Sequence, residues 1–258
     1  MTISFIITIF LIGFVGSFLS GMMGIGGAIV KYPMLLFIPA LLGFTAFTPH
    51  EVSGITAVEV FFASLSGVWA YRKSNLILKP LVLYMGISVL AGSALGGLGS
   101  SLLSEAAVNI VYGVLAVMAA IMMFVPKKGL DDIPIEDIIF NRLVASGAAF
   151  IVGLAAGIVG AGGAFIMVPV MLVILKIPTR VTIATSLAIT LLSSVGSASG
   201  KLFTGQVPYG PALVMIAASV IAAPIGVKAS RKVNTKVLQS ILAVLIVISA
   251  VKIWWDIF

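Results

Sequence analysis

The chain has 258 residues, of which 61% are hydrophobic and only 9% are charged. Soluble domains carry about 25% charged residues, so this composition excludes a soluble globular domain and indicates an all-α, polytopic membrane protein. The sequence contains no cysteine, which excludes disulfides, thiolate metal sites and a cysteine nucleophile. The net charge is +7, and the charged residues lie between apolar segments. Basic residues at such positions indicate membrane topology rather than nucleic-acid binding.

The apolar segments predict ten membrane-spanning helices, because about 20 apolar residues cross a bilayer as a helix. The predicted spans lie near residues 3–20, 28–48, 52–71, 78–99 and 106–125, and then near residues 142–158, 163–177, 181–203, 208–228 and 235–257. The N-terminal segment lacks the basic start of a secretory signal peptide, so it is interpreted as the first span. The charged segment 127–141 is interpreted as a cytoplasmic linker between two halves, residues 1–126 and 142–258.

The basic residues between the predicted spans fall almost entirely on one side of the membrane. Lys201 is the clear exception, and Lys252 lies near the far end of the last predicted span. Basic loops are retained in the cytoplasm. The pattern therefore predicts a multi-pass membrane protein with both termini outside the cytoplasm.

A glycine-rich motif occurs twice. "GMMGIGGAIVKYPMLL" at residues 21–36 and "GIVGAGGAFIMVPVML" at residues 157–172 share seven of sixteen positions without a gap. The similarity continues from "VSGITAVEVFFASLSGVWAYR" to "VTIATSLAITLLSSVGSASGK", which pairs Thr56 with Thr185. An odd number of spans in each half turns the second half upside down relative to the first. The predicted fold is therefore two inverted five-helix repeats with some discontinuous or re-entrant spans, a plan typical of secondary transporters.

The two motifs have the composition of helix breaks that bind an anion. Glycine frees the backbone from helical geometry, and a helix that begins inside the membrane points its free N–H groups and positive dipole end at what precedes it. Two such starts, one from each half, would converge on a shared site near the midplane. The predicted site glycines are Gly24, Gly26 and Gly27 in the first half and Gly160, Gly162 and Gly163 in the second. The alternative is that the glycines only permit tight helix packing.

Hydroxyl side chains inside two equivalent spans supply candidate donors for the same anion. Thr56, Thr185 and Ser186 are selected as substrate-binding residues. In the predicted span at residues 181–203, polar residues recur every three or four positions and therefore share one face of the helix. These residues are Ser186, Thr190, Ser193, Ser197 and Lys201. The alternative for any single hydroxyl is a hydrogen bond to its own helix or to a neighbouring helix.

Two oppositely charged residues lie within predicted spans of the first half. Glu59 is near the middle of its span, where an ionised carboxylate is costly and usually functional. Lys31 follows the first glycine motif and is selected as a substrate-binding residue, while Met167 stands at the equivalent position in the second half. Lys31 and Glu59 could form a structural ion pair, or Lys31 could face the anion while Glu59 carries a coupling proton. The sequence leaves both options open.

The paired motifs, with "IATSLAIT" after the second, resemble the TauE/SafE family of sulfite exporters and toluene-sulfonate uptake permeases, and the resemblance covers nearly the whole chain. It implies a secondary transporter of sulfite, sulfonates or other small organic anions in a bacterial or archaeal inner membrane. The residues that match the family pattern are Gly160, Gly162, Gly163, Pro169, Thr185 and Ser186. The first half departs from the pattern, with Ala57 where the family favours serine and with an added acid at Glu59.

The resemblance and the membrane potential together predict an exporter that works by alternating access. An inside-negative potential contributes about 2.3 kcal/mol per unit charge per 100 mV to expelling an anion, whereas uptake would need a coupling ion. No cofactor, metal ion, catalytic residue or nucleic-acid partner is expected; membrane lipid surrounds the chain, and a homodimer is left open. The alternatives are a transporter of another small organic anion, a cation-coupled uptake permease, an intramembrane enzyme using the "FLSG" serine with His50, and an assembly subunit of a larger complex.

Overall fold

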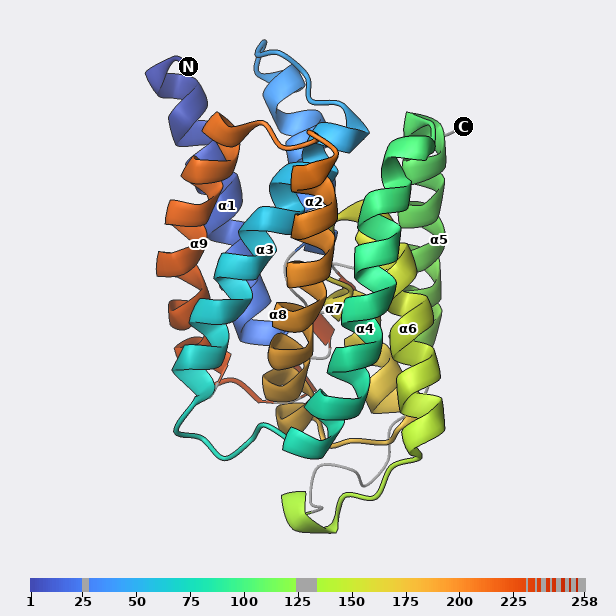
Figure 1. Cartoon of the computed structure of the whole chain (residues 1–258). Helices are drawn as coiled ribbons and strands as arrows, with labels where there is room; N and C mark the ends of the chain where they lie inside the picture. Colours follow the sequence, from blue (N-terminus) through green and yellow to red (C-terminus); the bar gives the residue numbers. More distant parts are fainter. Residues whose placement is uncertain are drawn as a thin grey trace.

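The structure is a computed structural model that describes residues 1–24, 28–123 and 134–230 and separate positions between residues 232 and 254. Within these residues the regular secondary structure is entirely helical, as predicted (Figure 1). The helices are α1 (Ile3–Met23), α2 (Ala28–Leu41), α3 (Pro49–Tyr71), α4 (Lys79–Gly99), α5 (Glu105–Met123), α6 (Arg142–Val159), α7 (Ala164–Pro169), α8 (Thr179–Phe203) and α9 (Tyr209–Ser230), with short helical turns η1 (Ser100–Leu102), η2 (Ile135–Asp137) and η3 (Val170–Ile174).

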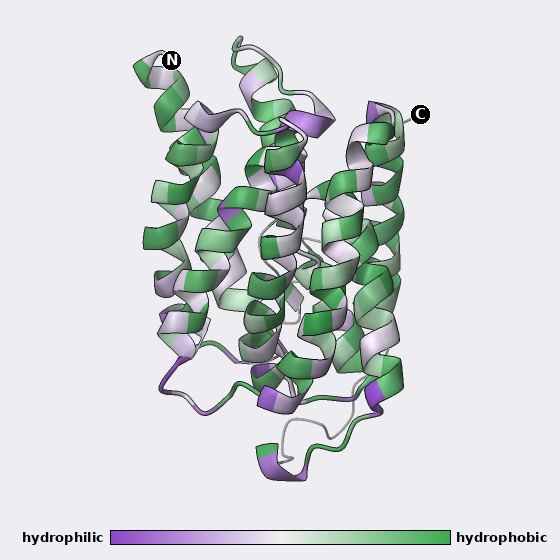
Figure 2. Cartoon of the chain, viewed as in Figure 1, coloured by the Kyte–Doolittle hydropathy of each residue, from purple (hydrophilic) through white to green (hydrophobic). Residues whose placement is uncertain are grey.

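Seven of the described helices are long and apolar enough to cross a membrane: α1, α3, α4, α5, α6, α8 and α9. Figure 2 shows that hydrophobic residues dominate these helices and that hydrophilic residues gather in the connections at their ends. The chain is therefore a multi-pass membrane protein. The predicted span at residues 235–257 lies mostly outside the described residues.

Two of the ten predicted spans are too short to be full spans. At residues 28–48 the only helix is α2, with 14 residues, and at residues 163–177 α7 and η3 together form an apolar helix over Ala164–Ile174. At about 1.5 Å per residue these helices reach about 21 Å and about 16 Å, less than the ~30 Å of a hydrocarbon core. The described residues thus contain seven helices long enough to span and two short ones, and ten spans, some of them discontinuous or re-entrant, stay a prediction.

Proline contributes to the irregularity of both short helices. Pro33 and Pro39 lie inside α2, and Pro169 stands where α7 passes into the π-helical η3. A proline inside a helix removes a backbone hydrogen bond and crowds the preceding turn. Hydropathy alone could not reveal the short length, because a helix buried in protein is as apolar as one that faces lipid.

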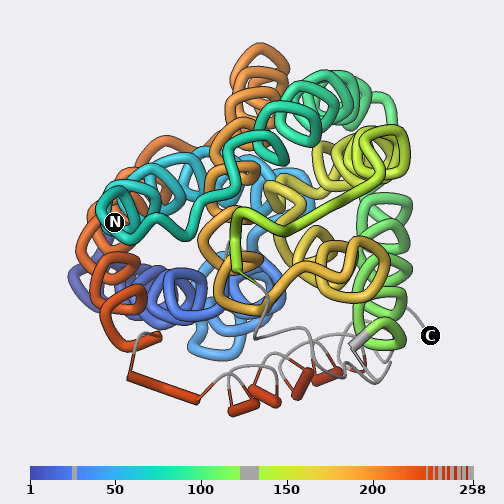
Figure 3. The backbone as a smooth tube through the Cα atoms, turned by 90° about the horizontal axis from the view of Figure 1, so that it is seen from below, coloured from blue at the N-terminus to red at the C-terminus, as the bar shows by residue number. Residues whose placement is uncertain are grey.

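The long helices form two groups that meet at α3 and α8. Viewed along the helices, α1, α3 and α9 gather on one side and α4, α5 and α6 on the other (Figure 3). Helix α1 packs along α9, and α4 packs along α6. Helix α3 packs on α8 and α9, while α8 packs on α4 as well. The two groups are thus joined through the contact between α3 and α8.

Glycines bring two of these helix pairs into backbone contact. A methyl group added to Gly226 of α9 would lie 2.0 Å from the carbonyl oxygen of Phe18, and one added to Gly96 of α4 would lie 2.0 Å from that of Leu154. The first glycines of the two motifs, Gly21 and Gly157, are in similarly close contact with the backbones of α9 and α4. The packing alternative therefore holds for those first glycines.

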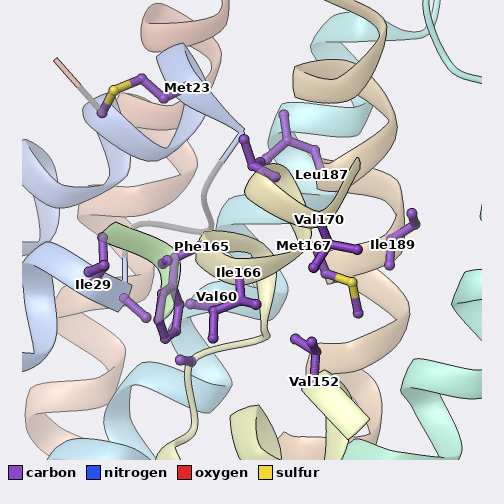
Figure 4. Packing of buried hydrophobic residues seen from close by; sticks show 14 of the residues in the cluster. Met23, Ile29, Val60, Val152, Phe165, Ile166, Met167, Val170, Leu187 and Ile189 are labelled. Atoms are coloured by element: carbon purple, nitrogen blue, oxygen red, sulfur yellow. The ribbon is translucent and has the colours of Figure 1, made fainter. Parts of the chain in front are cut away.

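The two short helices lie in the interior of the bundle. All six residues of α7 are buried, as are most residues of the first half of α2. Phe165, Ile166 and Met167 of α7 pack among Val60 of α3 and Ile189 of α8, together with side chains of α2 and α6 (Figure 4). The helices that follow the two predicted breaks are therefore surrounded largely by protein.

Candidate functional site

The two glycine motifs end their helices in the same way. Gly24 ends α1 with φ +73° and Gly160 ends α6 with φ +72°, both in the left-handed region that glycine adopts without strain. The Gly24 N–H donates to the Ser20 carbonyl, and the Gly160 N–H donates to the Ala156 and Gly157 carbonyls. Equivalent glycines thus stop equivalent helices inside the bundle. Gly26 and Gly27 lie outside the described residues.

The second motif then starts a new helix with free backbone donors. Gly162 and Gly163 have φ values of +63° and +72°, and the helix Ala164–Ile174 follows at once. Among the described residues, no group accepts a hydrogen bond from the backbone N–H groups of Gly162, Gly163, Ala164 or Phe165. These four buried amides stand at the positive end of the helix, the arrangement that binds anions at helix N-termini.

The three hydroxyls selected from the sequence all bond to backbone groups. Thr56 donates to the carbonyl oxygen of Val52 at 2.8 Å. Thr185 accepts from the N–H of Leu78 at 3.0 Å. Ser186 donates to the carbonyl oxygen of Gly24 at 2.7 Å, so the structure brings this serine of α8 to the first helix break. Their predicted role in substrate binding stays a prediction.

Lys31 and Glu59 form a fully buried ion pair, which is the first of the two options that the sequence left open. Ser17 of α1 completes the group, because its hydroxyl donates to Glu59 Oε1 at 2.6 Å and lies 3.4 Å from Lys31 Nζ. Gly16 makes room for the lysine stem, since a methyl group there would lie 2.1 Å from Lys31 Cγ. Sequence reasoning missed Ser17. The only available signal in the sequence was the Gly16-Ser17 pair inside the first predicted span.

The equivalent positions in the second half are apolar. The motif alignment places Met167 opposite Lys31, and the alignment that pairs Thr56 with Thr185 places Ala188 opposite Glu59. The charged pair therefore belongs to the first half alone.

Among the described residues, three buried hydroxyls have no hydrogen-bond partner: Ser20, Thr190 and Ser193. Thr190 and Ser193 lie on the polar face of α8 that the sequence spacing predicted, although neither was selected as a site residue. Ser20 lies near the end of α1, close in sequence to the Gly24 break. Within the described residues, no group of three His, Asp or Glu side chains could hold a metal ion.

The comparisons with known proteins define the class of this protein as a membrane transporter. The chain is 27% identical over 263 residues to the probable membrane transporter protein YunE of Bacillus subtilis, with 95% of each chain covered. It is 25% identical to the probable membrane transporter protein MJ0441 of Methanocaldococcus jannaschii, with 90% of this chain and 89% of that one covered. A probable membrane transporter protein of Xylella fastidiosa is 30% identical, with 72% of this chain and 70% of that protein covered.

The model of the family described as sulfite exporter TauE/SafE matches residues 9–253. The chain therefore belongs to the TauE/SafE family, which confirms the resemblance seen in the sequence. Its family and relatives are transporters and not enzymes. No solved structure matches the chain significantly.

Proposed function

We propose that this transporter exports small sulfur-containing anions, such as sulfite or organosulfonates, by alternating access between two inverted five-helix halves. The observation that carries the proposal is the row of four free, buried amides from Gly162 to Phe165. Free N–H groups at a helix start inside a membrane protein suit an anion, because they favour negative charge without a permanent counter-ion. The family described as sulfite exporter TauE/SafE supports the choice of substrate class.

The helix contacts support the inverted repeat. In an inverted repeat, α1, α3 and α4 of the first half would be equivalent to α6, α8 and α9 of the second half. The contact between α1 and α9 would then be equivalent to the contact between α6 and α4. The contact between α3 and α9 would likewise be equivalent to the contact between α8 and α4. All four of these helix contacts are extensive, and the contact between α3 and α8 is equivalent to itself. The glycine contacts follow the same exchange, because Gly226 meets Phe18 and Gly96 meets Leu154, which is equivalent to Phe18 in the motif alignment. Rocking one half against the other across α3 and α8 is the motion that we propose for transport.

We propose that the anion occupies the space between the two helix breaks. The proposed ligands are the glycine backbones of both motifs, with Thr56, Thr185, Ser186 and Lys31 as further candidates that would exchange their present partners on binding. Gly24 and Ser186 are already in contact, which supports a site shared by the first break and α8.

The basic end of the molecule is proposed to face the cytoplasm of a bacterial or archaeal cell. The segments 72–78 and 134–141 lie at one end of the bundle, and the N-terminus lies at the other (Figure 1). A cavity of about 600 Å³ at the first end is lined by Asn141 and Lys176, among others. We propose this cavity as the cytoplasmic entrance, which leaves the N-terminus outside.

Voltage-driven efflux from proteoliposomes tests this function. The purified protein is reconstituted with sulfite or methanesulfonate inside, and a potassium diffusion potential, negative inside, is imposed. Efflux should accelerate with the potential, because each unit of negative charge gains about 2.3 kcal/mol per 100 mV. Efflux that responds neither to the potential nor to a pH gradient would contradict the proposal.

A matched pair of glycine variants tests the helix break itself. Gly163→Ala should reduce efflux more than tenfold, because alanine at φ +72° is strained and would displace the free amides. Gly205→Ala is the control, since Gly205 has φ +69° but no atom within 4 Å of an added methyl group. Equal flux in the two variants would show that the Gly163 break has no role in transport.

Cation-coupled uptake is a second candidate, favoured by the fully buried carboxylate of Glu59. A membrane-buried acid is a usual site of proton coupling. In that case flux should follow the pH gradient instead of the potential, and Glu59→Gln should abolish it. Voltage-driven flux that persists in Glu59→Gln would exclude this candidate.

A further inference from the structure

We propose that Thr190 and Ser193 of α8 complete the anion site at the start of α7, so that one oxyanion is held by two hydroxyls and four backbone amides. This inference rests on the proposed function and makes it more specific. It assigns the binding hydroxyls to residues outside the set selected from the sequence.

The two hydroxyls differ from the other hydroxyls of their helix. Thr190 and Ser193 are fully buried, and neither makes a hydrogen bond. Ser194 donates to the Leu191 carbonyl at 2.8 Å, and Ser186 donates to the Ile183 carbonyl at 3.0 Å. Serine and threonine in helices normally use such bonds, and burying an unpaired hydroxyl costs about 1–3 kcal/mol. Two unpaired hydroxyls three residues apart on one helix face therefore indicate donors held ready for a ligand.

Both side chains lie against the glycines that carry the free amides. A methyl group added to Gly162 would lie 2.9 Å from Thr190 Cγ2, and one added to Gly163 would lie 3.9 Å from Ser193 Oγ. Gly162 and Gly163 begin the run of four free N–H groups that continues through Ala164 and Phe165. Thr190 and Ser193 of α8 thus lie beside the first two residues of the segment that carries the free amides.

The surroundings of Gly162 and Gly163 are apolar. A methyl group added to Gly162 would meet Val60, and one added to Gly163 would meet Val152. Both valines belong to the apolar core drawn in Figure 4. A hydrogen bond to a charged acceptor is stronger in such a low-dielectric environment. All six donors are neutral, so the anion is held without a fixed counter-charge and can leave without breaking an ion pair.

The number of donors favours a three-oxygen anion. Six donors can give two hydrogen bonds to each oxygen of a sulfite ion or of a sulfonate group. A carboxylate has only two oxygens, and it would share the same donors less completely. The site is therefore assigned to sulfite or to the sulfonate head of a small organic anion.

The first half lacks the equivalent pair of hydroxyls. Phe61 stands at the position equivalent to Thr190. Ser64 stands at the position equivalent to Ser193, and it donates to the Val60 carbonyl at 2.6 Å. Ser20 is the one unpaired buried hydroxyl described in the first half. The proposed anion cradle, which consists of the Thr190 and Ser193 hydroxyls and the amides of residues 162–165, thus belongs to the second half alone. It predicts one bound anion per chain.

Ligand binding to purified variants tests the inference. Methanesulfonate, sulfite and acetate are titrated into the detergent-solubilised protein by isothermal calorimetry. Thr190→Val and Ser193→Ala should each weaken methanesulfonate and sulfite binding about tenfold or more, because each removes a hydrogen bond to a charged group. Ser194→Ala and Ser64→Ala are the controls, since both hydroxyls already bond to their own helices. These controls should bind as the unchanged protein does, with one anion per chain.

Thermal unfolding without ligand separates binding from a structural role. Because Thr190 and Ser193 have no partners, their apolar replacements should leave the unfolding temperature unchanged or raise it. Lower stability with unchanged affinity would overturn the inference, and so would a stoichiometry of two.

The same titrations distinguish failure of this inference from failure of the proposed function. If the unchanged protein binds and transports sulfonate while both variants bind it equally well, the cradle is wrong and the proposed function stands. If both variants lose binding of acetate rather than of sulfonate, the proposed substrate class is wrong, and so is the three-oxygen assignment. If the unchanged protein binds none of the three anions, both are overturned.

Discussion

Two buried lysines of this protein have different kinds of hydrogen-bond partners. Lys31 in α2 and Lys201 in α8 are both fully buried. Lys31 is paired with the carboxylate of Glu59. The Lys201 ammonium instead donates to three neutral acceptors, which are Ser53 Oγ at 2.7 Å, the Ile158 carbonyl at 2.9 Å and Gln206 Oε1 at 2.9 Å.

The first site places a carboxylate beside the lysine, whereas the second surrounds the lysine with neutral acceptors. Ile158 belongs to the last turn of α6, so Lys201 lies at the negative end of a helix dipole, which partly offsets the missing carboxylate. A neutral buried pair adds little to the field that a passing anion experiences. A protonated lysine without a carboxylate partner attracts it. The difference predicts a larger loss of stability when Lys31 is replaced than when Lys201 is replaced.

The largest expected effect is the loss of one member of the neutral pair. Lys31→Met alone, or Glu59→Leu alone, should lower the free energy of unfolding by about 3–5 kcal/mol, because each leaves a buried charge without its partner. The double variant Lys31→Met with Glu59→Leu should recover most of this loss, since apolar residues of similar volume replace the pair. Chemical denaturation in detergent gives the coupling energy. Additive losses in the double variant would show that the pair is not a unit.

A smaller effect is expected at the hydroxyl that supports the pair. Ser17→Ala removes the 2.6 Å hydrogen bond to Glu59 Oε1 and should cost about 2 kcal/mol, the usual range for a hydrogen bond to a charged group. The same denaturation experiment measures it. In the background of the double apolar variant the loss should nearly vanish. A loss that persists there would place the role of Ser17 elsewhere.

The smallest effect on stability is expected at the unpaired lysine. Lys201→Met removes hydrogen bonds to neutral acceptors and leaves no charged group without its partner, so it should cost about 1 kcal/mol. Anion efflux should nevertheless fall several-fold, because the amine that can carry a positive charge at the end of α8 is lost. Lys201→Arg keeps the charge and serves as the control. A stability loss as large as that of Lys31→Met, with normal efflux, would reverse the comparison.

Much of the architecture could be read from residue patterns. The apolar segments gave the membrane class and the long helices, because crossing a bilayer requires long apolar helices whatever the tertiary packing. The duplicated glycine motif located both helix ends, since Gly24 and Gly160 occupy a backbone conformation that other residues adopt with strain. The length of α2 and α7 could not be predicted, because an apolar run of residues does not show whether lipid or protein will surround it.

The sequence by itself therefore determined that the protein is helical, membrane-spanning, interrupted at two equivalent glycines and a member of a transporter family. Only the tertiary structure decided which polar groups are free. The sequence pattern selected Thr185 and Ser186 rather than Thr190 and Ser193 of the same helix. In the structure the first two bond to Leu78 and Gly24, while the last two have no hydrogen-bond partner among the described residues. Likewise, Lys31 and Glu59 meet because α2 and α3 pack together. Hydrogen bonds and ion pairs are satisfied by whichever groups packing brings within about 3 Å, and no local pattern of residues records that distance.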